Sequence, residues 1–424
     1  MWELENPILY VILDGVGDRP VPKYGNRTPL EVAQTPNLDR LAARGAMGIA
    51  YTIKRGVAPE SDAGVFSLLS YDPSRIDLAR GVVEAIGSSV SFRDGDLALR
   101  CNFATVQDGK ILDRRAGRDL AGEEAKELVN ALNDDSGLKD LAEFELRATI
   151  GHRCALVLHA HPKRFSSAIS NIDPAYVRSG RITIAKSAVK LPVPIPKCRA
   201  LNLTKGAAAT ARLLNKFASR IQVVLEEHPV NLRRIRRGLL PANFLLMRDA
   251  GTRTPIVQTL QEKFGLRSIA LADMPVELGI AKVVGMDIEI FLPDRTLEGY
   301  AQRAKKATEL TKRYDLVYVH LKGPDEPGHD GDFDGKRKSI EDIDAGFFAS
   351  LEDVESKLAC VTADHSTPCV AKAHTDDPVP ILIAGPSVSP DGSIRFTESY
   401  AKNGRIGTVS HGFKILNMLT KMAS

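Results

Sequence analysis

The sequence predicts an α/β fold in which helices cover both faces of a mostly parallel sheet. Three apolar runs are typical of buried strands: Ile8–Leu13, Leu316–Leu321 and Leu358–Ala363. Strand and helix patterns alternate near the N-terminus and again after about residue 240, which favours a parallel sheet. Carboxylate or imidazole side chains follow each of the three runs. Because ligands of such sheets bind at the carboxyl ends of the strands, the sequence predicts a polar site at that edge.

The N-terminal elements come in the order strand, loop and helix. The Ile8–Leu13 strand leads into a loop rich in proline and glycine, and then into a helix expected over Asn37–Arg44 that Gly45 would end. A further helix is expected to begin near Val65, shortly after the pair Ser61-Asp62.

The segment from residue 85 to residue 239 has a different pattern. Short alternating stretches such as Leu97–Val106, followed by Gly109, suit an antiparallel hairpin. Helices are expected over Gly122–Leu132 and Gly206–Phe217. We therefore expect an inserted α+β cap domain over residues 85–239, within a discontinuous core formed by residues 1–84 and 240–424.

The C-terminal half returns to alternating strands and helices. Strands are expected over Phe244–Met247, Ser268–Leu271, Leu316–Leu321, Cys360–Ala363 and Ile381–Ala384. Helices are expected over Pro275–Val284, Glu298–Tyr314 and Lys336–Ser356. All of these elements are expected to belong to the core sheet and its flanking helices.

The composition excludes several classes of protein. With 43% hydrophobic and 26% charged residues the chain is an ordinary globular protein, and a net charge of +4 over 424 residues gives no sign of a nucleic-acid partner. No apolar run approaches the ~20 residues that cross a membrane. Five cysteines without CxxC spacing are typical of free thiols, and we expect no signal peptide in the acidic first residues. We expect a cytoplasmic protein.

Six side chains near the ends of the predicted strands are candidate metal ligands. They are Asp14, Asp325, His329, Asp364, His365 and His374. A single histidine is usually structural or exposed, but six donors at neighbouring strand ends are a stronger signal and suffice for two sites. Carboxylates bind hard divalent cations, and imidazoles add affinity for borderline ones. The pattern indicates a metalloenzyme.

Ser61 is the candidate nucleophile. It lies at a predicted junction between loop and helix, so a helix N-cap is the simpler interpretation when the residue is considered alone. Beside six metal donors, a serine activated by a cation becomes the better hypothesis. Two divalent cations would be balanced by three aspartates and one serine alkoxide, and this neutral cluster could accept a phosphate dianion.

These motifs resemble a known family. Asp14-Gly-Val-Gly, the Ser61-Asp62 loop, Asp325-x3-His329, Asp364-His365-Ser and His374-Thr match the metal and nucleophile pattern of the alkaline phosphatase superfamily. Stretches along nearly the whole chain resemble its archaeal-type cofactor-independent phosphoglycerate mutases, among them Thr35–Asp39, Arg100–Val106, Asp113–Arg118, Gly151–Arg153 and Gly279–Met286. One departure lies next to the serine, where the family pattern is closer to Gly-Ser-Asp-Thr-Ala-His and this chain has Glu60 before Ser61 and Gly64 three residues after it.

The resemblance implies an alkaline-phosphatase-like core with an inserted domain that clamps the substrate. It implies one metal bound by Asp325, His329 and His374, and another bound by Asp14, Ser61, Asp364 and His365. Ser61 would take the phosphoryl group during interconversion of 2- and 3-phosphoglycerate, without 2,3-bisphosphoglycerate. Manganese is the first expectation for both ions, and zinc, cobalt or magnesium would also suit the donor set.

Phosphoglycerate carries two anionic groups, for which arginine is a suitable partner because its planar fork matches an oxyanion. The candidate substrate-binding residues lie in family-like segments: Asn102, Arg115, Arg118, His152, Arg153, Arg248 and Lys282. Any one of these cations could instead be a solvated or ion-paired surface residue. The dense basic segment Asn231–Arg237 is interpreted as a solvated helix face or a contact between subunits of a homo-oligomer, in preference to a nucleic-acid site.

Two alternatives stay open from the sequence. A phosphomonoesterase or phosphodiesterase of the same superfamily would share every metal ligand, but it would not need the arginines of Asp113–Arg118 and Arg153. A metal-binding relative without activity is the third hypothesis, and the altered surroundings of Ser61 keep it open.

Overall fold

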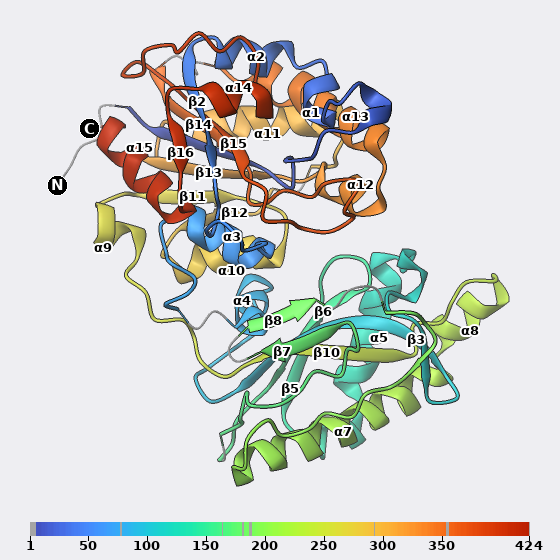
Figure 1. Ribbon diagram of the computed structural model, residues 1–424. Helices are drawn as coiled ribbons and strands as arrows, with labels where there is room; N and C mark the ends of the chain where they lie inside the picture. Colours follow the sequence, from blue (N-terminus) through green and yellow to red (C-terminus); the bar gives the residue numbers. More distant parts are fainter. Residues whose placement is uncertain are drawn as a thin grey trace. The chain divides into compact units, whose positions relative to one another are not determined.

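The computed structural model describes residues 6–76, 79–162, 164–179, 182–185, 189–291, 293–352 and 356–423 (Figure 1). Residues 1–5, which bear on the signal-peptide expectation, lie outside this set. The chain divides into two compact units. The first unit comprises residues 1–76, 257–273 and 280–424, and the second comprises residues 77–256 and 274–279. No helix among the described residues is long and apolar enough to cross a membrane.

An eight-stranded sheet forms the centre of the first unit. Its strands are β1 (Ile8–Leu13), β2 (Gly45–Ala50), β11 (Ser268–Leu271), β12 (Asp287–Glu289), β13 (Leu316–Leu321), β14 (Leu358–Thr362), β15 (Val379–Ala384) and β16 (Gly407–Val409). Their spatial order is β12-β11-β13-β1-β14-β15-β2-β16. Only β15 runs antiparallel to its neighbours, so the expectation of a mostly parallel sheet is confirmed.

The direction of β15 decides which residues meet at one edge. Because β15 is antiparallel to β14 and β2, its amino end lies beside their carboxyl ends, as the pairing of Val379 with Ala50 shows. Residues that precede β15 and residues that follow β1, β2, β13 and β14 therefore gather at the same edge. Strand β2 was not expected from the sequence: Gly45 was expected only to end a helix, but it is also the first residue of this strand.

Helices cover both faces of this sheet, with α11, α13 and α14 on one side and α15 on the other (Figure 1). The helices of the first unit are α1 (Pro29–Val32), α2 (Pro36–Ala42), α3 (Ser61–Leu68), α9 (Leu260–Phe264), α11 (Leu297–Leu310), α12 (Asp325–Asp330), α13 (Phe333–Gly346), α14 (Glu398–Asn403) and α15 (Ile415–Ala423). Helix α10 (Pro275–Val283) is shared between the two units.

Helix α13 is shorter than the helix expected over Lys336–Ser356. It ends at Gly346, and a 3-10 turn follows over Phe348–Ser350. A Cβ atom at Gly346 would lie 2.6 Å from Tyr300 Cβ and 2.7 Å from the Leu297 carbonyl oxygen of α11. Close packing of the two helices therefore requires glycine at the end of α13. The last part of the expected helix, residues 353–355, lies outside the described residues.

The second unit is an α+β layer built on an antiparallel sheet. Its strands are β3 (Leu97–Gln107), β4 (Lys110–Asp113), β5 (Phe144–Ala148), β6 (Arg153–Leu158), β9 (Val193–Pro194) and β10 (Phe244–Gly251), with β7 (Tyr176–Ser179) and β8 (Ile182–Ala185) as a separate pair. Its helices are α4 (Arg80–Gly87), α5 (Gly122–Asp134), α6 (Ser136–Lys139), α7 (Lys205–Glu226) and α8 (Pro229–Arg236). The hairpin expected after Leu97 is confirmed as β3 and β4.

Strand β10 corrects one expectation. The run Phe244–Met247 was expected in the core sheet, but β10 pairs antiparallel with β3 in the second unit. All eight residues of β10 are buried, and a continuous apolar run does not reveal to which sheet a strand belongs. The division into a phosphatase-like core and a clamping cap, with boundaries after residues 84 and 239, stays a prediction.

The basic segment Asn231–Arg237 was expected to be a solvated helix face, but one of its arginines is buried. Arg234 of α8 is fully buried and forms ion pairs with Asp119 and with Glu124. Its guanidinium also donates to the carbonyl oxygens of Ala116 and Leu240. This arginine therefore stabilises the turn that carries Arg118. The subunit contact suggested for this segment stays a prediction.

Candidate metal centre

All six candidate ligands lie at the edge of the sheet defined above. Asp14 directly follows β1, and Asp364 and His365 follow β14 within three residues. Asp325 and His329 are one turn apart on α12, which begins four residues after β13. His374 precedes the antiparallel β15 and reaches the same edge from the opposite chain direction.

Three of the ligands form a buried group, consisting of Asp14, Asp364 and His365. His365 Nε2 lies 3.5 Å from Asp14 Oδ1 and 3.3 Å from Asp364 Oδ2. Ser61 Oγ lies 3.3 Å from the same nitrogen. Ser61 is the first residue of α3, and the N-cap position before it is taken by Glu60, which makes no side-chain capping bond. The N-cap interpretation of Ser61 is therefore wrong.

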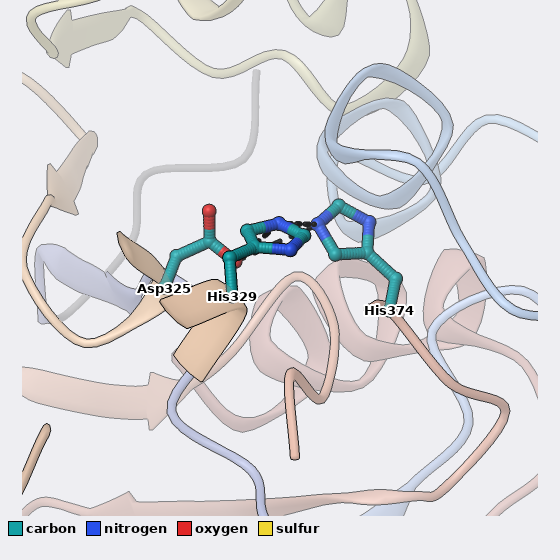
Figure 2. A group of neighbouring side chains, drawn as sticks. All are labelled: Asp325, His329 and His374. Carbon is teal, nitrogen blue, oxygen red and sulfur yellow. Dashed lines mark hydrogen bonds and ion pairs between the residues drawn. The ribbon is translucent and has the colours of Figure 1, made fainter. Parts of the chain in front are cut away.

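The other three ligands, Asp325, His329 and His374, form an outer group, which is drawn in Figure 2. Asp325 Oδ1 lies 3.4 Å from His329 Nε2 and 3.5 Å from His374 Nε2. The two Nε2 atoms are 3.2 Å apart. The groups are adjacent, because the His365 and His374 rings stack with centroids 3.7 Å apart.

The donor atoms of the outer group fit a cation. His329 Nδ1 lies 3.2 Å from the Lys372 carbonyl oxygen, and His374 Nδ1 lies 2.9 Å from that of Pro59. A carbonyl oxygen only accepts, so both Nδ1 atoms carry a proton, and in the neutral rings both Nε2 atoms present lone pairs. Two Nε2 atoms that face each other beside a carboxylate need a positive charge between them, which can be a second proton on His374 or a metal ion. A divalent cation satisfies this need.

The buried group also fits a cation. Asp14 Oδ1 and Asp364 Oδ2 are buried, and no donor among the described residues forms a hydrogen bond with either oxygen. The second oxygen of each carboxylate is held elsewhere: Lys322 Nζ lies 2.9 Å from Asp14 Oδ2, and the Gly15 amide donates to Asp364 Oδ1 at 3.2 Å. Each aspartate thus has one anchored oxygen and one oxygen that is available to a metal.

The pKa values reflect this crowding of like groups. Burial raises the pKa of Asp364 to about 7, and the charge of Asp14 adds to the effect. Burial also acts to raise the pKa of Asp14, but Lys322 and His320 outweigh it and hold that pKa well below its usual range. Burial would lower the pKa of His374, yet Asp325 raises it to about 9. Such divergence among neighbouring titratable groups is typical of a functional site.

Lys322 and His320 had no assigned role in the sequence analysis. His320 is the penultimate residue of β13, and Lys322 follows the strand directly. His320 Nε2 lies 3.8 Å from Asp14 Oδ1 and 4.0 Å from Asp364 Oδ2. Their position at a strand end is the signal that identified Asp14, and it could have identified them as well.

The second unit contains an arginine cluster, formed by Arg80, Arg100, Arg114, Arg115, Arg153 and Arg248. Arg248 is almost fully buried: Nη1 lies 3.0 Å from Asp173 Oδ2, and Nη2 donates to Asn102 Oδ1 at 3.4 Å. Its guanidinium carbon lies 4.6 Å from the centre of the Tyr176 ring. Arg114 binds both oxygens of Asp173, each at 2.9 Å.

Positive charge exceeds negative charge in this cluster. Burial and the charge of Arg80 lower the pKa of Arg100 to about 10, although Glu84 opposes the shift. Burial and the neighbouring charges of Arg153 and Arg115 lower the pKa of His152 to about 3. A region that resists further protonation is suited to an anion.

The structure brings together five of the seven predicted substrate-binding residues, namely Asn102, Arg115, His152, Arg153 and Arg248. Arg118 is exposed on the adjoining turn. Burial lowers the pKa of Arg115, and the charge of Arg118 makes a smaller contribution in the same direction. Lys282 belongs to the first unit and lies half-buried in the last turn of α10. The roles of all seven residues stay predictions.

Comparison with known proteins gives a consistent result. A model of the family "2,3-bisphosphoglycerate-independent phosphoglycerate mutase" matches residues 42–231. A mutase of this name from Aeropyrum pernix is 45% identical, with 96% of this chain and 97% of the relative covered. The chain belongs to this family. The corresponding mutase from Ignicoccus hospitalis is 39% identical, with 94% and 93% of the two chains covered.

Solved structures support membership of the mutase family. A protein from Pyrococcus horikoshii superimposes with a TM-score of 0.78 at 31% identity, and 99% of this chain and 98% of that chain are covered. A cofactor-independent phosphoglycerate mutase from Thermoplasma acidophilum gives a TM-score of 0.62 at 32% identity, with 99% and 100% covered. The expected α/β class and the resemblance to cofactor-independent phosphoglycerate mutases are therefore confirmed.

Proposed function

We propose that this chain interconverts 2-phosphoglycerate and 3-phosphoglycerate through a phosphoserine at Ser61, without 2,3-bisphosphoglycerate. The observation that carries the proposal is the position of Ser61 Oγ, 3.3 Å from His365 Nε2 and therefore next to the buried group. Membership of the mutase family supports the same reaction. The position of the phosphoryl acceptor, the arrangement of the metal donors and the family all support the mutase reaction.

We assign two divalent cations to the site. Asp14, Asp364, His365 and Ser61 would hold one ion, and the outer group would hold the other. When bound, the ions lower the pKa of the serine hydroxyl and offset the charge that develops during phosphoryl transfer. Mixed oxygen and imidazole donors suit Mn²⁺, and Zn²⁺, Co²⁺ or Mg²⁺ are the alternatives.

The remaining steps belong to the chain's own residues. Ser61 Oγ forms a bond to phosphorus while the bond from phosphorus to one glycerate oxygen breaks, and that oxygen takes up a proton. The other hydroxyl of the retained glycerate then loses its proton and forms a bond to phosphorus while the bond from phosphorus to Ser61 Oγ breaks. Ser61 begins α3, and the free amides of a helix N-terminus favour an anionic group at that position. Because the group returns to the same glycerate, water must be excluded during the exchange.

We further propose that the second unit supplies the cations that hold the substrate. Its arginine cluster has excess positive charge. Burial, and after it the charge of Arg80, lowers the pKa values of Arg100 and Arg153, and a phosphate or carboxylate would relieve the repulsion. Asn102, Arg115, Arg118 and His152 would complete this contact surface of the second unit. Lys282, in the first unit, is a further predicted substrate-binding cation.

The deciding experiment follows two products from 3-phosphoglycerate in the presence of Mn²⁺. Appearance of 2-phosphoglycerate is measured through coupled dehydration and oxidation of a reporter, and inorganic phosphate is measured in parallel. We expect 2-phosphoglycerate without matching phosphate release. Release of phosphate as the main product would instead identify a phosphomonoesterase.

A pair of serine variants controls this assay. Ser61→Ala should abolish formation of 2-phosphoglycerate, whereas Ser67→Ala should retain it, because the buried Ser67 hydroxyl lies in the same helix and forms no hydrogen bond with any described residue. Activity that survives in Ser61→Ala would refute the phosphoserine route.

We also propose a cytoplasmic location. The five cysteines are free and buried in the structure, which suits a reducing compartment. Cell fractionation with an antibody to the chain tests this assignment. Recovery of the chain in an oxidising compartment would contradict it.

A further inference from the structure

Thr367 lies between the two ligand groups, although it is not itself among the metal ligands. Its hydroxyl oxygen lies 2.7 Å from Asp325 Oδ1 of the outer group. The same oxygen lies 3.0 Å from His365 Nδ1 of the buried group. Thr367 is fully buried, so its hydroxyl has these two partners in place of bulk water.

The backbone of Thr367 is held on both sides. Its amide donates to the Gly17 carbonyl oxygen at 3.0 Å, and its own carbonyl oxygen accepts from Lys336 Nζ at 2.8 Å. Lys336 is itself buried and paired with Asp18 at 2.9 Å. The position of the hydroxyl is therefore set by the surrounding structure.

Glycine leaves the space that this hydroxyl occupies. Gly15 has a φ of +62°, and a Cβ atom there would lie 2.8 Å from Thr367 Oγ1 and 2.8 Å from Asp325 Oδ1. A side chain at position 15 would press against both partners of the hydrogen bond. The close approach of β1's end to Thr367 thus depends on glycine.

A hydroxyl has one proton, and this fact determines the direction of both hydrogen bonds. The ionised Asp325 carboxylate can only accept, so the 2.7 Å contact requires the threonine proton. The hydroxyl must then accept from His365, which places a proton on Nδ1. If the hydroxyl donated to Nδ1 instead, two oxygens would face each other at 2.7 Å with no proton between them.

We propose that Thr367 is a positioning residue that fixes His365 in the Nδ1–H tautomer and links the two ligand groups. The hydrogen-bonded chain runs from His365 Nδ1–H to Thr367 Oγ and from its hydroxyl to Asp325. It leaves the His365 Nε2 lone pair directed at Ser61, Asp14 and Asp364. His329 and His374 obtain the same tautomer from backbone carbonyls, and His365 alone among the three site histidines obtains it from a side chain.

This inference rests on the proposed function in one respect, namely that the two groups bind cations. A group that holds the outer nitrogen of a ligating histidine typically contributes 10–100-fold in metal affinity. We expect Thr367→Val, which has the same shape without the hydroxyl, to weaken Mn²⁺ binding by about 10–100-fold in calorimetric titration. Thr367→Ser keeps the hydroxyl and should stay within about threefold of the native affinity.

A matched control separates positioning from stability. Thr362, at the end of β14, is also fully buried, and its hydroxyl donates to the Pro380 carbonyl oxygen at 2.9 Å. Thr362→Val should lower the melting temperature to a similar extent as Thr367→Val while leaving Mn²⁺ affinity unchanged. Equal loss of Mn²⁺ affinity in both valine variants would overturn the proposal.

Nitrogen NMR provides a test that requires neither metal nor turnover. In metal-free protein labelled with ¹⁵N-histidine, and with His365→Gln used to assign the signal, the native protein and Thr367→Ser should show a protonated Nδ1 at His365. Thr367→Val should lose this preference. A native signal with the proton on Nε2 would overturn the proposal, even if no valine variant folds. Absence of mutase activity in the native protein, with the tautomer as expected, would contradict the proposed function alone.

Discussion

Removal of the two cations should lower the free energy of unfolding of the first unit, because each ligand group contributes the binding energy of one ion. At a free cation concentration one hundred times the dissociation constant, each site adds about 2.7 kcal/mol to the free energy of unfolding. Both groups lie in the first unit, so chelation should remove about 5 kcal/mol from it. For roughly 240 residues the entropy of unfolding is about 0.5 kcal/mol/K, so the melting temperature should fall by about 10 °C.

Differential scanning calorimetry with and without a chelator measures this shift. The second unit contains neither ligand group and provides an internal reference, since its transition should not move. Activity should disappear with the shift and return when Mn²⁺ is added back. A shift of less than about 1 °C, or activity that survives exhaustive chelation, would refute the two-metal interpretation of this site.

Further predictions concern four single-residue variants. Ser61→Ala should lower kcat by more than about a thousandfold, because the attacking oxygen is removed. Calorimetric titration of this variant should still detect two bound Mn²⁺ ions. Loss of both ions would contradict the role of Ser61 as the nucleophile. Arg248→Met should lower the free energy of unfolding by about 1.5–3 kcal/mol, since Asp173 loses one charged partner but keeps its paired contact with Arg114. Arg118→Met on the exposed turn should raise KM and change the free energy of unfolding by less than about 0.5 kcal/mol. Urea unfolding and initial rates measure both variants. The pKa of His152 is about 3 in the folded chain, so between pH 6.5 and pH 3 mainly the unfolded chain takes up this proton. Lowering the pH from 7 to 5 should therefore reduce the free energy of unfolding by at most about 2 kcal/mol through His152. His152→Gln should reduce this loss, as measured by urea unfolding at the two pH values.

Much of the first unit could be predicted from local sequence. The runs that form β1, β13 and β14 are mostly apolar and are followed by polar residues. Both the strand conformation and the edge of the sheet that carries the metal donors could therefore be predicted. The ligands at these ends were then predicted to converge, and the six donor side chains do lie in two adjacent groups.

Other features depend on contacts between distant segments. Strand β2 has the sequence Gly-Ala-Met-Gly-Ile-Ala, in which small residues hide a strand that is otherwise buried. Its two glycines are required by neighbouring strands, since a Cβ at Gly45 would lie 2.4 Å from the Ile383 carbonyl oxygen. The assignment of β10 to the second sheet likewise depends on its pairing with β3, about 140 residues earlier in the chain, and no local pattern contains that information.

The role of the Thr367 hydroxyl also depends on a contact between distant segments and could not be predicted from the local sequence. A threonine two residues after a ligand has no distinguishing mark in the sequence. Its importance arises from the position of Asp325, which lies 42 residues away along the chain. Residues that bind a metal directly can be recognised by type, whereas those that orient the ligands are recognised only in space.

The unequal exposure of the two ligand groups has a consequence for handling the protein. The His329 side chain is 41% exposed, whereas the His365 and Asp364 side chains are 0% exposed. If each group holds an ion as proposed, the outer ion can exchange readily with solvent, while the inner ion leaves slowly and is removed only by exhaustive chelation. Purified protein would then retain one ion through dialysis and yet be inactive until the vacant outer position is refilled. A preparation that contains a single equivalent of metal would be half-loaded, and its lack of turnover would say nothing about the integrity of the enzyme.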